Sequence, residues 1–208
     1  ELPNARAALQ WAEERREAEL GLRLAVAFSR FWYSRGQMSE AEGWLERMLA
    51  LNGQAEERGV PLVLRADALY LYGDTLVSLG KLERAEAVAT EALERARAGL
   101  DHSGMSMAFT ILGMVAQVRR KLDEAATYFT ESYMHARQTE HLSIRGTALG
   151  KRAELARMQG DMVQATALFE EALSGVQAIG MTWGIAGNTT MLGHLACQSQ
   201  NYALAKAR

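Results

Sequence analysis

Apolar and small residues recur along this chain at the three- to four-residue spacing of amphipathic helices. Polar breaks follow runs of about fifteen helix-favouring residues, and they lie at 35–37, 80–81, 119–121, 159–161 and 199–201. Only two prolines occur, and alanine, leucine, glutamate and arginine dominate over β-branched residues. The pattern therefore predicts an all-α chain of short helices.

The same pattern repeats with a fixed period. A small residue stands inside the first helix of each predicted pair, and its positions, 40 residues apart, are Gly73, Gly113, Ala153 and Gly193. Glycine inside a helix costs roughly 1 kcal/mol relative to alanine, so a recurring glycine needs compensation from packing. We expect these small residues to let the first helix of each pair approach the second.

The surrounding residues resemble the tetratricopeptide repeat. In one copy, Phe109, Leu112 and Gly113 are followed by Ala125 and Phe129, in the family's order of leucine-glycine, then alanine and an aromatic residue. The standard unit has about 34 residues, so these units are longer. A divergent first copy lies 44 residues ahead of the second, with its surplus in a polar stretch at 52–61.

This resemblance implies a right-handed superhelical solenoid of antiparallel helix pairs with repeats of roughly 40 residues. We expect a single domain over 1–208. Its parts would be a lead-in helix in 1–21, repeats at about 22–65, 66–105, 106–145 and 146–185, and a partial repeat at 186–208.

Several phrases, most of them in the N-terminal region, resemble one group of tetratricopeptide-repeat proteins in particular. Asn4, Arg6 and Trp11 precede the phrases "GLRLA" (21–25), "FWYSRG" (31–36) and "WLERML" (44–49), and "TWGIAG" follows at 182–187. These phrases resemble the sensor region of bacterial signal-transducing ATPases with numerous domains (STAND), such as the maltose-regulon activator and LuxR-type transcriptional regulators. The resemblance implies a non-catalytic sensor or scaffold segment, with nucleotide-binding and DNA-binding domains upstream. A freestanding tetratricopeptide adaptor for protein assembly is the alternative.

Composition excludes several other functions. The net charge of −2 and pI near 6.2 give no basic field for nucleic acid or an anionic membrane. A single cysteine and the lack of a run of about 20 apolar residues favour the cytoplasm. The chain begins without methionine and ends within a helical pattern, so we expect a fragment of a longer protein.

Catalytic and metal-binding patterns are weak. No glycine-rich loop ends in Gly-Lys-Ser or Gly-Lys-Thr, so we expect no ATP hydrolysis and no cofactor. Glu131 and His135, and His194 and Cys197, have helical spacing, but two ligands do not make a zinc site. Cys197 has no orienting acid in reach of His194, and we expect no enzyme activity.

The tetratricopeptide resemblance places binding on the concave face formed by the first helices. The family's groove positions carry both charges, tyrosines and methionines here, a mixture that suits a protein or peptide segment or a small-molecule inducer. The expected groove residues are Arg30, Tyr33, Tyr70, Asp74, Met107, Met114, Gln117, Glu154, Arg157 and His194.

Arg152 departs from the repeat, because Leu112 and Leu192 occupy its equivalent positions. An unpaired buried charge is costly. We expect Arg152 either to extend its charged end to solvent or to pair with Glu154 or Glu131.

Overall fold

The computed structural model describes residues 2–54 and 60–198, which form ten α-helices and no strand within those ranges. The helices are α1 (Leu2–Glu14), α2 (Ala18–Ser34), α3 (Met38–Gln54), α4 (Leu62–Ser78), α5 (Leu82–Ala98), α6 (His102–Val118), α7 (Leu122–Ala136), α8 (Leu142–Met158), α9 (Met162–Ala178) and α10 (Thr182–Gln198). The all-helical prediction is confirmed. Among these described helices, none combines the length and apolar character needed to cross a membrane.

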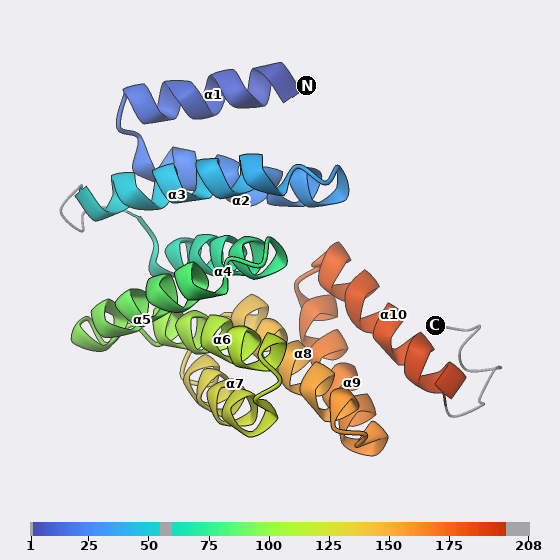
Figure 1. The fold of residues 1–208 in the computed structure, drawn as a ribbon. Coiled ribbons are helices and arrows are strands. Elements are labelled where there is room, and N and C mark those ends of the chain that lie inside the picture. The colour runs from blue at the N-terminus through green and yellow to red at the C-terminus, as the bar shows by residue number, and fades with distance from the viewer. Residues whose placement is uncertain (1, 55–59, 199–208) are drawn as a thin grey trace.

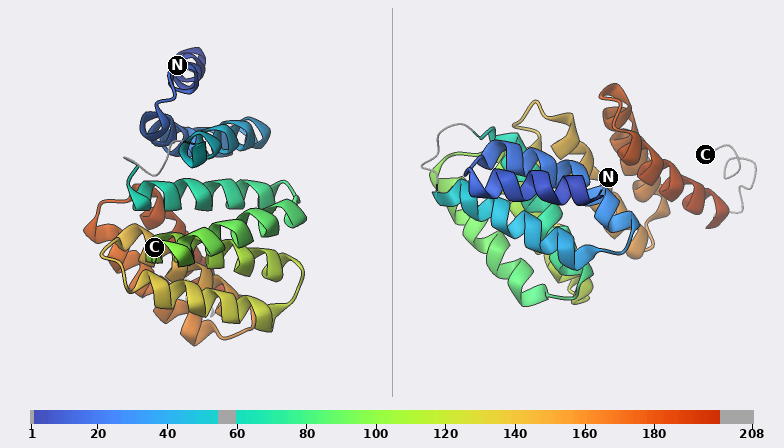
Figure 2. Two further views of the ribbon diagram at one scale, coloured as in Figure 1. Left: turned by 90° about the vertical axis from the view of Figure 1, so that its left-hand side faces the viewer. Right: turned by 90° about the horizontal axis from the view of Figure 1, so that it is seen from above.

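The helices stack as successive antiparallel pairs (Figures 1 and 2). Helices α2, α4, α6 and α8 are the first helices of four pairs, and each contacts the first helix of the next pair or its own partner. Helix α10 packs on α9 as a fifth first helix. The stack curls, so that α10 returns beside the end of α4 (Figure 1). The predicted helical-repeat solenoid is confirmed.

The helices retain the period seen in the sequence. The first helices begin at Ala18, Leu62, His102, Leu142 and Thr182, so successive starts are 44, 40, 40 and 40 residues apart. The predicted repeat starts at 22, 66, 106, 146 and 186 lie four residues inside these helices. The lead-in helix α1 ends at Glu14, earlier than the expected 21.

Tight turns close the first helices. Gly80 has a φ of 73°, and the Lys81 amide donates to the Leu76 carbonyl at 2.9 Å while the Gly80 amide donates to Val77 at 3.0 Å. This bond pattern is a Schellman motif, which favours glycine because the left-handed residue carries no Cβ. Arg120 takes the equivalent place with a φ of 62°.

The recurring small residues serve two interfaces. A Cβ at Gly113 would overlap the Phe129 ring of the partner helix α7, as the sequence predicts. A Cβ at Gly73 would instead overlap Ile111 of α6, the first helix of the next repeat. The expectation that Gly73 admits its own partner helix is therefore wrong. It allows close packing between successive first helices.

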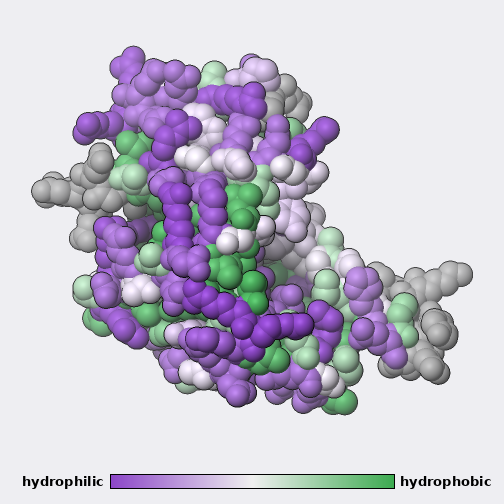
Figure 3. Space-filling view, viewed as in Figure 1, coloured by the Kyte–Doolittle hydropathy of each residue, from purple (hydrophilic) through white to green (hydrophobic). Residues whose placement is uncertain are grey.

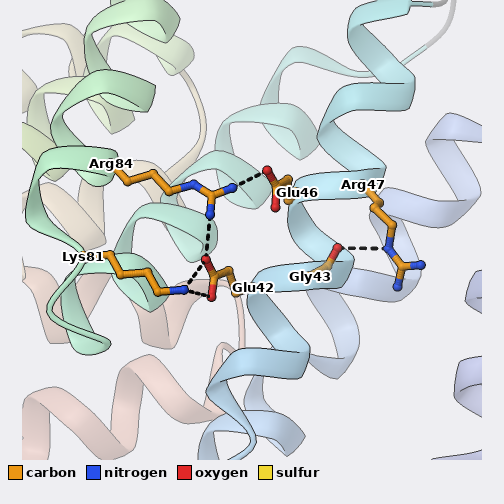
Figure 4. Close-up of polar contacts among 6 residues, drawn as sticks. All are labelled: Glu42, Gly43, Glu46, Arg47, Lys81 and Arg84. Atoms are coloured by element: carbon orange, nitrogen blue, oxygen red, sulfur yellow. Dashed lines mark hydrogen bonds and ion pairs between the residues drawn. The ribbon is translucent and has the colours of Figure 1, made fainter.

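Ion pairs around one buried carboxylate join the first two repeats (Figure 4). Glu42 of α3 is only 6% exposed. Its carboxylate accepts hydrogen bonds from Lys81 Nζ at 2.7 and 2.8 Å and from Arg84 Nη1 at 3.0 Å, and Arg84 also bonds Glu46. Two cations thus compensate the desolvation of Glu42. On the face drawn in Figure 3, hydrophilic residues surround a central group of hydrophobic ones.

Packing at Gly113 can be tested against a glycine with free space. Gly113→Ala should destabilise the fold, because overpacking costs about 1–3 kcal/mol and exceeds the helix-propensity gain. Gly175→Ala in α9 is the control, since a Cβ there meets nothing within 4 Å, and it should stabilise by up to about 1 kcal/mol. Urea unfolding measures both variants, and equal stabilisation would contradict the close contact with Phe129.

Candidate binding groove

Two adjoining cavities lie among the first helices. The first has a volume of about 150 Å³ and lies between α4, α8 and α10. The second has a volume of about 350 Å³ and lies between α4, α6 and α8. Lys151 and Glu154 of α8 line both cavities. The two cavities therefore form one groove with these two side chains at their junction.

Lys151 is the most unusual group in the groove. Its side chain is 20% exposed, and its ammonium lies 3.8 Å from the Glu154 carboxylate. Within the described residues, Lys151 Nζ has no hydrogen-bond acceptor. An ammonium carries three donors, so beyond its ion pair with Glu154 the Lys151 side chain has donors available for water or for a bound molecule.

Neighbouring groups keep Lys151 charged. Burial by itself lowers the pKa of the ammonium, but Tyr70, Asp74 and Glu154 outweigh burial and raise it above the ordinary lysine value. Burial raises the pKa of Tyr70 to about 12 despite Lys151, so Tyr70 is neutral at pH 7. Burial likewise raises the pKa of the Asp74 carboxyl, with Lys151 opposing the shift. The junction thus holds a cation, carboxylates and a phenol.

The first and last described repeats meet at the mouth of the groove. The guanidinium carbon of Arg30 in α2 lies 3.9 Å from the ring centroid of Trp183 in α10. Burial lowers the pKa of Arg30, with Tyr70 opposing the shift. This cation–π contact joins helices that are distant in sequence, and Trp183 also lines the first cavity.

The structure brings six of the expected groove residues together. Tyr70 and Glu154 line the first cavity, and Arg30 lies at its mouth against Trp183. The second cavity is lined by Asp74, Met114, Gln117 and Glu154.

The other four expected residues lie elsewhere. Met107 is 1% exposed and packs in an interior cluster with Ile144, so its assignment to the groove needs correction: neighbouring first helices cover it. Tyr33 is 65% exposed and His194 is exposed, and neither lines either of these two cavities. Arg157 is partly buried outside both cavities, and its Nε has no hydrogen-bond partner.

The sequence prediction missed Lys151 and Trp183. Lys151 immediately follows the expected groove position Gly150, and the equivalent residues of the other repeats are Ala27, Leu71, Ile111 and Met191. A lysine within this apolar series is a signal that the sequence contains. The sequence contains no comparable signal for Trp183, because the place of its indole depends on the curl that brings α10 toward α2.

Arg152 extends to the surface of the solenoid. Its guanidinium carbon lies 4.8 Å from the Tyr133 ring centroid, and the Tyr133 hydroxyl donates to Glu171 at 2.9 Å. The residue is partly exposed, and the ion pairs of the described residues do not join it to Glu131 or Glu154. Of the two expectations, extension toward solvent agrees with this arrangement.

No protein-family model and no curated protein matches the chain. Solved structures do match its fold. A Rap protein complexed with competence and sporulation factor superposes with a TM-score of 0.71 at 14% identity, over 90% of this chain and 52% of that chain. BtubC from P. vanneervenii gives a TM-score of 0.64 at 16% identity, over 99% and 85%.

A STAND protein with a tetratricopeptide repeat sensor from Pyrococcus horikoshii gives a TM-score of 0.58 at 17% identity, over 89% of this chain and 29% of that chain. The chain thus spans about half of the Rap structure and less than a third of the STAND structure. At these identities the similarity establishes a tetratricopeptide-like repeat fold.

Asp67 of α4 gives a pH-dependent prediction. Burial raises its carboxyl pKa from 3.8 to about 6, with His141 opposing the shift. The folded state therefore binds more protons than the unfolded state between these values, and the Asp67 contribution to stability falls as pH rises from 4 to 7. Asp67→Asn should remove this pH-dependent fall in the free energy of unfolding. The fall reaches about 3 kcal/mol for an unscreened group, and solvent screening makes it smaller. Urea unfolding from pH 4 to 8 measures the difference between the two proteins, and a pH-independent difference would contradict the assignment.

Proposed function

We propose that this chain is a non-catalytic sensor or scaffold segment that binds a polypeptide segment of a partner in the groove around Lys151. The observation that carries the proposal is Lys151, whose side chain is 20% exposed, lines two cavities and has no hydrogen-bond acceptor among the described residues. In the free protein, water can accept hydrogen bonds from the Lys151 ammonium. A bound molecule can supply an acceptor in place of that water.

The charge state of Lys151 favours binding over covalent chemistry. A nucleophilic lysine requires a depressed pKa, so that the neutral amine is available. The pKa of Lys151 is raised instead. The group therefore acts as a fixed cation and hydrogen-bond donor.

A polypeptide has hydrogen-bond donors and acceptors that complement those of the groove. The second cavity presents Lys151 and Arg120 as donors, and Asp74 and Glu154 as acceptors. These charges balance, so a neutral ligand with alternating donors and acceptors leaves no net buried charge. A peptide backbone has this composition, and Met114 and the other apolar groups can adapt to its side chains.

The larger context of the proposal is a bacterial regulator. The N-terminal phrases resemble STAND and LuxR-type sensors, and the structural likeness to a STAND tetratricopeptide sensor supports this context. In such a protein, partner binding would act on upstream nucleotide-binding and DNA-binding domains. An adaptor without those domains is the alternative, and the 85% coverage of the BtubC chain is compatible with it.

The central role of Lys151 can be tested with selected peptides. A random peptide library displayed on phage would be selected against the immobilised protein, and the enriched peptides measured by calorimetry. Lys151→Met keeps the side-chain length and removes the donor, so affinity should fall at least tenfold, or about 1.4 kcal/mol.

Lys121→Met is the matched control, because that lysine side chain is 59% exposed in the turn before α7. It should bind as the unmodified protein does. Failure to enrich any peptide would count against a peptide-binding function. Unchanged affinity in Lys151→Met, with an unchanged melting temperature, would remove Lys151 from the site.

A further inference from the structure

The first cavity is space that the protein does not use for its own packing. A Cβ added at Gly187 of α10 meets nothing within 4 Å, and one at Gly150 of α8 meets only Asn188 Oδ1, at 3.8 Å. Gly73 and Gly113 are different, because a neighbouring side chain occupies the space beside each of them. Glycine lowers helix stability, and at Gly150 and Gly187 no close packing compensates for it.

The wall of the cavity is largely apolar. Tyr70 and Trp183 contribute aromatic rings, and Val176 and Met181 contribute aliphatic surface. Its volume of about 150 Å³ is below the roughly 300 Å³ at which pockets begin to hold drug-sized ligands. The cavity therefore suits one side chain of a longer ligand, whose neighbouring residues extend into the second cavity.

The polar end of the cavity restricts which side chain fits. Lys151 has unused donors, and the Glu154 carboxylate lies 3.8 Å from its ammonium. A phenol hydroxyl can accept a hydrogen bond from the ammonium and donate one to the carboxylate. For an acidic side chain the attraction of Lys151 is opposed by the repulsion of Glu154, and for a basic one the attraction of Glu154 is opposed by the repulsion of Lys151, so neither gains the two favourable contacts that a hydroxyl makes.

From this arrangement we infer that the first cavity is a specificity pocket for an aromatic side chain of the bound segment, with a preference for tyrosine over phenylalanine. The ring would pack against Trp183 and Tyr70, and the hydroxyl would lie between Lys151 and Glu154. This inference rests on the proposed function, because it assigns one residue class within the bound polypeptide.

The experiment uses peptides selected against the unmodified protein and a variant that fills the pocket. Gly187→Leu places a side chain in the cavity without overlap at its Cβ, and Gly175→Leu in α9 is the control, since a Cβ there also meets nothing within 4 Å. We expect enriched peptides to share a tyrosine. Gly187→Leu should weaken their binding at least tenfold, and Gly175→Leu should leave it unchanged.

Peptide variants then test the hydroxyl. Replacing the shared tyrosine by phenylalanine should weaken binding about fivefold, or roughly 1 kcal/mol, in the unmodified protein. The same replacement should have a smaller effect in Lys151→Met, because the hydroxyl then keeps only its hydrogen bond to Glu154. Circular dichroism confirms folding, and Gly187→Ala, which narrows the pocket less, should have a smaller effect than Gly187→Leu.

The outcomes separate the two proposals. If no peptide is enriched, the proposed function fails and the pocket inference fails with it. If peptides are enriched without a shared aromatic residue and bind Gly187→Leu unchanged, the pocket inference is overturned while the proposed function stands. Equal binding of tyrosine and phenylalanine peptides would overturn the preference for tyrosine.

Discussion

Close approach between helices at small residues is the constraint on which this solenoid depends. Gly113 admits the Phe129 ring from its partner helix, and Gly73 admits Ile111 from the next repeat. One kind of contact holds a pair together, and the other sets how successive pairs stack. Because the helix pairs themselves recur in a 40-residue register, small per-repeat rotations accumulate into the curl that forms the groove.

The groove arises where this packing rule is relaxed. Gly150 and Gly187 lie on helices that approach without filling the space between them. Lys151 lies beside this space in place of the apolar residue of the other repeats. Local departures from a consistent packing pattern are typical of functional sites.

Most of the fold could be predicted from the sequence, because helix periodicity and repeat register are local signals. The helix that packs against Gly73 could not be predicted, since a small residue permits close approach without specifying which helix approaches. Met107 was misplaced for a similar reason. The family's groove positions assume a standard repeat, whereas α6 is buried over nearly its whole length by α4, α5, α7 and α8.

Under the proposed function, the curl would also allow binding in this groove to produce a signal. Four first helices line the two cavities, and Trp183 contributes to the first cavity while its ring holds Arg30 across the mouth. A change in the rotation between repeats alters the separation of these groups. A ligand that contacts α4, α8 and α10 together therefore binds one curvature better than another. Such differential affinity is the physical requirement for a ligand to shift a conformational equilibrium. Under the proposed function, the superhelix itself is the element that converts occupancy of the groove into a change of shape.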